Sequence, residues 1–157
     1  MKFPYLRRVF MKVESKSISL SIVFTTVFAL AMAFLTVSIP WLVPFLCKIM
    51  EHVGIEKFMT VVAYLSLPAG WGAVALLYKI LFNVKKKKVF VTENVKYLNI
   101  LSFLCIYVGL ICAVAMFKYF GFLFVGISAF FIGLIIRIVR NVIEEAITIK
   151  QENELTI

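Results

Sequence analysis

Few residues of this chain could perform chemistry. The sequence has one histidine, His52, and its eight acidic residues are all glutamates. None of these glutamates lies within the four long apolar stretches of the sequence, where acidic side chains usually serve proton relays. The sequence contains no Cys-x-x-Cys pair, no glycine-rich phosphate loop and no Ser, His and Asp set. We therefore expect no catalytic residue, no cofactor and no enzymatic activity.

The nearest approach to a metal-ligand set is Cys47, His52 and Glu56. On a helix, His52 and Glu56 would share one face, with Cys47 about one turn earlier. Their spacing matches no recognised pattern of zinc ligands. We expect an ordinary polar surface here and no bound metal.

The composition indicates which elements must position these few polar residues. Of the residues, 63% are hydrophobic and only 16% are charged, whereas soluble domains are roughly 45–50% apolar. Four apolar windows cover residues 17–39, 58–82, 95–117 and 122–143, each close to the roughly 20 residues that cross a bilayer. The sequence predicts an all-α, polytopic membrane protein, a single domain over residues 1–157 with four transmembrane helices in an antiparallel bundle.

Basic residues are unevenly distributed between the two ends of these helices. Fourteen lysines and arginines precede the first helix, flank the second connection or close the fourth helix, and three lie at the opposite end, namely Lys48, Lys57 and Lys118. The positive-inside rule places the richer side in the cytoplasm. Both termini are therefore predicted to be cytoplasmic.

Four consecutive lysines, Lys85, Lys86, Lys87 and Lys88, lie in the second connection, residues 83–94, which we call the lysine loop. We interpret them as topology anchors that also contact anionic lipid headgroups. A nucleic-acid site or a specific phosphoinositide site is the alternative. The net charge of +9 is the expected result of orientation in a membrane protein, so we expect no direct nucleic-acid binding.

Small residues and a proline mark the helices themselves. Pro68, Gly70 and Gly72 predict a kink in the second helix, which either opens a cavity or improves packing. Small residues recur every fourth position on the third and fourth helices, a spacing that permits close backbone approach: Cys105, Gly109 and Ala113, and Ala129 and Gly133. The pattern leaves room for a homo-oligomer but does not fix its number of copies.

The two ends of the cytoplasmic side carry further polar residues. Thr92 is expected as the N-cap of the third helix, with Glu93 and Asn94 in its first turn. Residues 144–157 form an acidic tail that continues the fourth helix, with Ile143 and Ile147 in an apolar row. Such a row favours a partner, which is this chain's own lysine loop, another protomer or a cytoplasmic protein.

Residues 89–95, "VFVTENV", and residues 152–157, "ENELTI", resemble motifs of a family of small bacterial integral membrane proteins, the domain of unknown function 2975 family. Its members carry a "VFTxENV"-like turn before the third helix and an "ENDLTI"-like end. Here Val91 is inserted in the first motif, and Glu154 replaces the aspartate of the second. With the four-span layout, the resemblance covers nearly the whole chain.

The resemblance implies a multi-pass protein of the bacterial cytoplasmic membrane with a small helix-turn-helix, DNA-binding regulator as its cytoplasmic partner. We predict a regulatory or interaction protein that binds this partner through both motifs, with these contact residues: Glu93, Asn94, Glu152, Asn153, Glu154, Leu155 and Ile157. In the alternative arrangement, Glu152 or Glu154 pairs with the lysine loop of the same chain. The alternative function is a small transporter, channel or toxin-immunity protein with a cavity beside Pro68.

Overall fold

Four helices make up almost all of the chain in the computed structural model, which describes residues 4–49 and 54–155 and the side chains of residues 18–49 and 54–153. They are α1 (Pro4–Ile49), α2 (Glu56–Lys85), α3 (Thr92–Ala115) and α4 (Gly121–Leu155). Helices satisfy their own backbone hydrogen bonds, which is what an apolar surrounding requires of a spanning segment.

All four helices contain a segment long and apolar enough to cross a membrane. These segments are Ile18–Ile49, Glu56–Lys85, Thr92–Ala115 and Gly121–Asn153. The prediction of an all-helical, multi-pass membrane protein is thereby confirmed. The first and last helices are longer than their apolar windows, since α1 begins at Pro4 and α4 ends at Leu155.

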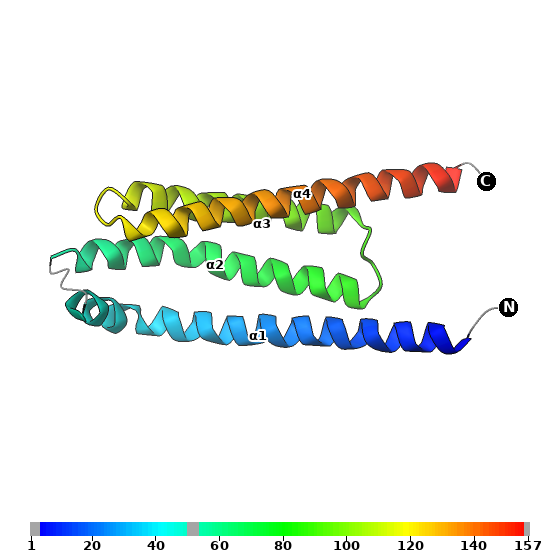
Figure 1. Cartoon of the computed structure of the whole chain (residues 1–157), viewed down its shortest axis with the longest axis horizontal. Coiled ribbons are helices and arrows are strands. Elements are labelled where there is room, and N and C mark those ends of the chain that lie inside the picture. The colour runs from blue at the N-terminus through cyan, green and yellow to red at the C-terminus, as the bar shows by residue number, and fades with distance from the viewer. Residues whose placement is uncertain (1–3, 50–53, 156–157) are drawn as a thin grey trace.

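The helices lie side by side in a row, in the order in which they occur in the sequence (Figure 1). Among the described residues, α1 packs only on α2 and α4 packs only on α3, while α2 and α3 contact each other. Figure 1 shows the N-terminal end of α1 and the C-terminal end of α4 at the same end of the molecule, beyond the α2–α3 connection. The helices therefore form an open row whose two edges are α1 and α4.

The tightest packing joins α3 to α4, at glycines of α4. A Cβ atom added at Gly133 would lie 3.3 Å from the Cβ of Cys105, and one at Gly126 would lie 3.3 Å from the Cβ of Cys112. The Ser102 hydroxyl donates a 2.9 Å hydrogen bond to the Gly133 carbonyl across this contact. Small residues on both helices thus bring the two backbones together.

Polar side chains join the first three helices. The Tyr78 hydroxyl donates to Thr26 Oγ1 at 2.8 Å, and Trp71 Nε1 donates to Thr36 Oγ1 at 3.3 Å, both between α2 and α1. The Tyr107 hydroxyl of α3 donates to the Leu65 carbonyl of α2 at 3.2 Å.

Candidate functional site

The lysine loop begins with a well-defined end of α2. The Lys88 N–H donates to the Asn83 carbonyl and the Lys87 N–H donates to the Val84 carbonyl, each at 2.9 Å. Lys87 has a φ of 59°, in the left-handed region that glycine usually occupies. These are the two hydrogen bonds and the conformation of a Schellman motif, with a lysine at the position where glycine is favoured.

Asn94 holds the other half of the loop. Its side chain is only 2% exposed, and its amide nitrogen donates to the carbonyls of Lys88 and Val89 at 3.0 and 2.9 Å. Its Oδ1 accepts a 2.8 Å hydrogen bond from Asn83 Nδ2. One buried side chain therefore connects α3, the loop and the last turn of α2, and fixes the backbone that carries the lysines.

The charged side chains of the loop point outward. Lys85, Lys86, Lys87 and Lys88 are all exposed, as is Glu93. The Lys86 ammonium lies 4.2 Å from the centre of the Phe82 ring, and Lys79 lies 5.5 Å from that of Tyr97. A partner that contacts this loop in the described conformation meets the lysines and Glu93, whereas Asn94 shapes the surface from inside.

Helix α3 begins differently from the sequence-based expectation. Thr92 is its first residue, and Val91 occupies the N-cap position with extended backbone angles and no side-chain cap. The expectation that Thr92 is the N-cap was wrong. The physical reason is the Asn94 side chain, which donates hydrogen bonds to the carbonyls of Lys88 and Val89. These bonds hold the loop against the first turn of α3, so the helix starts without a hydroxyl cap.

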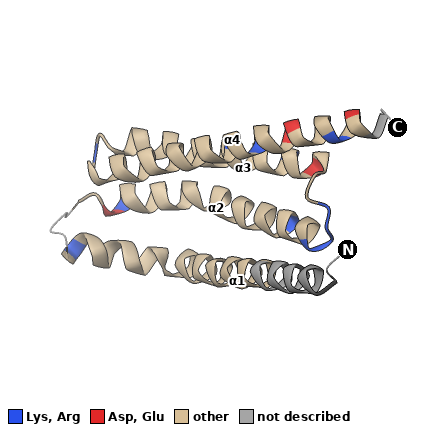
Figure 2. Cartoon of the chain, turned by 45° about the vertical axis from the view of Figure 1, so that its right-hand side comes forward, with Lys and Arg blue, Asp and Glu red and all other residues tan. Residues whose placement is uncertain are grey.

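The acidic tail leaves the row of helices. Gly133 lies against Ser102 and Cys105, and Gly126 lies against Gly109 and Cys112. Continuing the spacing of these contacts along both helices places Thr92, the first residue of α3, near Glu145. The helix then runs on to Leu155, about 15 Å beyond α3 at 1.5 Å per residue. Figure 2 shows this end of α4 extending past the lysine loop.

The structure separates the two sets of predicted partner-binding residues. Glu93 lies near the height of Glu144, whereas Glu152 lies eight residues further along α4 than Glu144, about 12 Å away along the axis. Glu152 and Asn153 are exposed. The backbone of Glu154 and Leu155 continues the helix, but their side chains and all of Ile157 lie outside the described residues.

The predicted alternative, in which Glu152 or Glu154 pairs with the lysine loop, stays a prediction, because the side chain of Glu154 lies outside the described residues. Among the described residues, helices α4 and α2 do not contact each other, but Lys86, Lys87 and Lys88 follow the end of α2. An ion pair within α4 joins Arg140 to Glu144 at 3.0 Å. One side of α4 forms a shallow groove where the tail begins, lined by Asn141, Val142, Glu145, Ala146 and Ile149.

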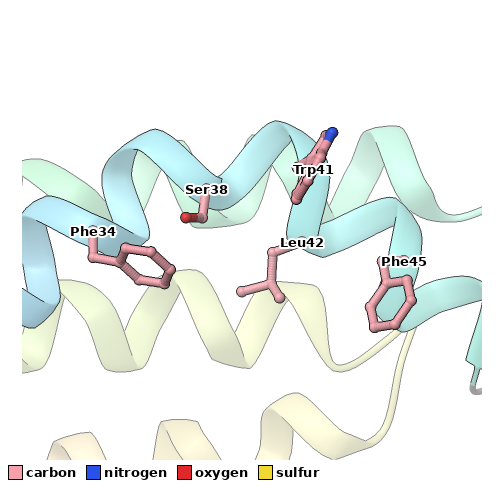
Figure 3. Close-up of a pocket in the computed structure, with 5 residues that line it drawn as sticks. All are labelled: Phe34, Ser38, Trp41, Leu42 and Phe45. Atoms are coloured by element: carbon pink, nitrogen blue, oxygen red, sulfur yellow. The ribbon is translucent and has the colours of Figure 1, made fainter.

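The residues around Pro68 are packed against neighbouring helices. Gly70 faces the end of the Met32 side chain of α1, and a Cβ at Gly72 would lie 3.0 Å from Leu104 Cδ1 of α3. A larger hollow lies on α1, which bends where it contains Pro40 and Pro44 (Figure 1). It is open to the surface, has a volume of about 600 Å³ and is lined by Phe34, Ser38, Trp41, Leu42 and Phe45 (Figure 3).

The residues considered as metal ligands are placed only in part. Cys47 is buried, and its Sγ lies 3.5 Å from Met59 Sδ. His52 lies outside the described residues. No group of three His, Cys, Asp or Glu side chains that could hold a metal occurs within residues 4–49 and 54–155.

Asn83 is the residue of this site that the sequence-based reasoning missed. It bonds to Asn94 across the lysine loop, although the sequence draws attention only to the second asparagine. The available signal was weak: asparagine is unfavourable in helix interiors and favours ends and turns, so an asparagine just before the lysines indicates the end of α2.

A family model described as "Protein of unknown function (DUF2975)" matches residues 32–157. The matched part includes all of the described residues of α2, α3 and α4, both motifs and residues 32–49 of α1. Neither the curated proteins nor the solved structures contain a match to the chain. Because the matched residues make up most of the sequence and fold into the expected four apolar helices, the chain belongs to the DUF2975 family of proteins of unknown function.

Proposed function

We propose that this chain is a non-enzymatic regulatory protein of a bacterial cytoplasmic membrane, which docks a cytoplasmic partner on its lysine loop and acidic tail. The four helices form an antiparallel bundle in the membrane, with both ends of the chain in the cytoplasm. The distribution of basic residues supports this orientation, since the lysine loop, the start of α1 and the end of α4 share one end of the row (Figure 1).

The observation that carries the proposal is the projection of the acidic tail. Its helix continues about three turns beyond the row, with Ile149 half exposed among charged residues. An exposed apolar residue on a charged, solvent-facing helix is a typical feature of helices that bind a partner. The rigid lysine loop at its base adds positive charge, which also contacts anionic lipid headgroups.

The partner that we propose is a small DNA-binding regulator of the helix-turn-helix type. Proteins of this type present a basic face to the phosphates of DNA. Glutamates of the tail would contact the same face, because complementary charge steers association and excludes DNA from the occupied surface. The membrane protein would thus hold the regulator away from its operator and would not itself bind nucleic acid.

The test is a pull-down from native membranes with the intact chain and with the chain truncated after Gln151. We expect a small helix-turn-helix protein with the intact chain and its loss with the truncated one, both chains being folded by size-exclusion chromatography. A Lys118→Gln variant, altered at the opposite end of the row, is the matched control and should retain the partner. Equal recovery of the regulator with the truncated chain would contradict the role of the tail.

The proposal also predicts competition with DNA. Adding the purified chain to the captured regulator should lower its occupancy of operator DNA, measured by fluorescence anisotropy, and Glu93→Gln should weaken this effect. Operator binding that does not change with the added chain would overturn sequestration as the mechanism.

A further inference from the structure

Two charged helical segments project from the same end of the row, at its opposite edges. One is the acidic tail of α4. The other is residues 4–18 of α1, which we call the basic arm. The contact between Thr26 and Tyr78 places Lys85, the last residue of α2, near Ser19 of α1, so the arm continues about 20 Å beyond α2. Figure 1 shows both segments reaching a similar distance beyond the lysine loop.

The two segments carry opposite charge. The basic arm contains Arg7, Arg8, Lys12 and Lys16 with a single acid, Glu14. Residues 144–155 of the tail contain Glu144, Glu145, Glu152 and Glu154 with a single base, Lys150. Opposite charges on two neighbouring helices favour their pairing and fix its register.

Both segments also carry apolar residues at helical spacing. The arm has Leu6, Val9 and Val13 in its sequence, and the tail has Ala146 and Ile149 along the groove that begins at Asn141 and Val142. Ile149 is 50% exposed. Within lipid such exposure costs nothing, but beyond the membrane apolar burial becomes favourable again. Burial of apolar side chains against a partner would therefore stabilise the projecting segments more than the rest of the row.

The arm and the tail of one chain cannot reach each other in this structure. Helices α2 and α3 lie between α1 and α4, which have no contact with each other among the described residues. A second copy in the same membrane has the same orientation, so the two copies are related by a twofold axis along the membrane normal. Where such an axis runs beside the middle of the row, it places α1 of each copy beside α4 of the other, which forms the same contact twice.

The heights of the charges fit this arrangement. Three contacts between neighbouring helices relate positions on α1 to positions on α4: Thr26–Tyr78, Lys79–Tyr97 and Ser102–Gly133. Counting residues along each helix from these contacts places the backbone of Lys12 at about the same level along the helix axes as Glu152. The same count places Lys16 a turn nearer the membrane, beside the groove that ends at Ile149. The paired helices run in opposite directions, since α1 begins and α4 ends at the same end of the row (Figure 1).

We propose that this chain forms a twofold dimer in which the basic arm of each copy docks on the acidic tail of the other. This inference goes beyond the proposed function and does not rest on it, because it concerns the purified chain alone. The arm of the second copy and the regulator of the proposed function would compete for the same tail, whereas the lysine loop stays accessible in the dimer.

The test is a charge exchange between two variants. One carries Lys12→Glu and Lys16→Glu in the basic arm, and the other carries Glu145→Lys and Glu152→Lys in the tail. The mass of the protein part of the detergent complex is measured by light scattering and, after reconstitution, the copy number by single-molecule photobleaching. Lys57→Glu with Lys118→Glu, at the other end of the row, is the matched control.

We expect the wild-type chain and the control to be dimers. Each charge variant alone should dimerise at least about a hundredfold more weakly, because four ion pairs, two in each contact, are lost at about a threefold factor each and like charges then face each other. Mixing the two variants should restore a dimer that contains one copy of each, since the acidic arm of one then meets the basic tail of the other. High salt should weaken the wild-type dimer.

Several outcomes would overturn the proposal. A monomeric wild-type chain would do so, as would a charge variant that remains dimeric by itself. If the mixture stays monomeric while both changes on one chain restore wild-type behaviour, the arm and tail pair within a chain. The lysines of the loop are retained in every variant, and the orientation of each is verified with a C-terminal reporter.

Discussion

Asn83 Nδ2 donates a 2.8 Å hydrogen bond to Asn94 Oδ1, which joins the last turn of α2 to the first turn of α3. The same Asn94 side chain donates to two carbonyls of the connection between these helices. The lysine loop is consequently a fixed structural element, and its exposed charges have a defined position relative to both helices.

Replacing Asn94 with alanine should destabilise the fold by about 2 kcal/mol, because burial leaves its former partners without the hydrogen bonds that it supplies. The free energy of unfolding can be measured by denaturant titration in mixed micelles. Asn99→Ala, at a half-buried position of the same helix, is the control and should cost less. An equal cost at both positions would show that the hydrogen bonds of Asn94 do not stabilise the loop.

Replacing Lys87 with glycine should stabilise the protein by about 1 kcal/mol, because Lys87 adopts the left-handed conformation that is unfavourable for residues with a Cβ. Lys86→Gly is the matched control. Its φ of −81° is ordinary, so glycine there should give no gain. Thermal unfolding of the purified chain in detergent separates the two variants, and a stabilised Lys86→Gly would argue against the conformational explanation.

Replacing Gly133 with valine should separate α3 from α4, because the position faces Cys105 Cβ and the Ser102 carbonyl at 3.3 and 3.4 Å from an added Cβ. Overpacking of this kind costs about 1–3 kcal/mol. Ser128→Val, on an exposed position of α4, introduces the same side chain without a facing helix. Unfolding in mixed micelles should distinguish them, and similar stability of both variants would contradict the close contact.

The proposed orientation predicts which cysteines a membrane-impermeant thiol reagent reaches in intact cells. In a background with Cys47, Cys105 and Cys112 changed to alanine, Lys118→Cys should react from outside and Lys87→Cys should react only after the membrane is opened. Both positions are exposed at opposite ends of the row. Labelling of Lys87→Cys in intact cells would reverse the assignment of the cytoplasmic side.

Much of the architecture could be predicted from local sequence. Four apolar stretches of spanning length determined four membrane-type helices, because burial of backbone polar groups in lipid leaves few other structures. The small residues at Cys105 and Gly133 predicted close helix approach, and the two face each other in the α3–α4 contact. The family was predicted from the motifs around Glu93 and Glu152 and is confirmed over residues 32–157.

Only the tertiary structure decided which of the candidate residues share a surface. The sequence grouped Glu93, Asn94 and Glu152 as one set, yet Asn94 is buried and Glu152 lies well beyond Glu93 along α4. Hydrophobic periodicity is a local property that determines where a helix can form. Which helices touch, how far one extends past its neighbour and which side chains bond across a loop depend on contacts between residues distant in the sequence, such as Asn83 with Asn94 and Ser102 with Gly133.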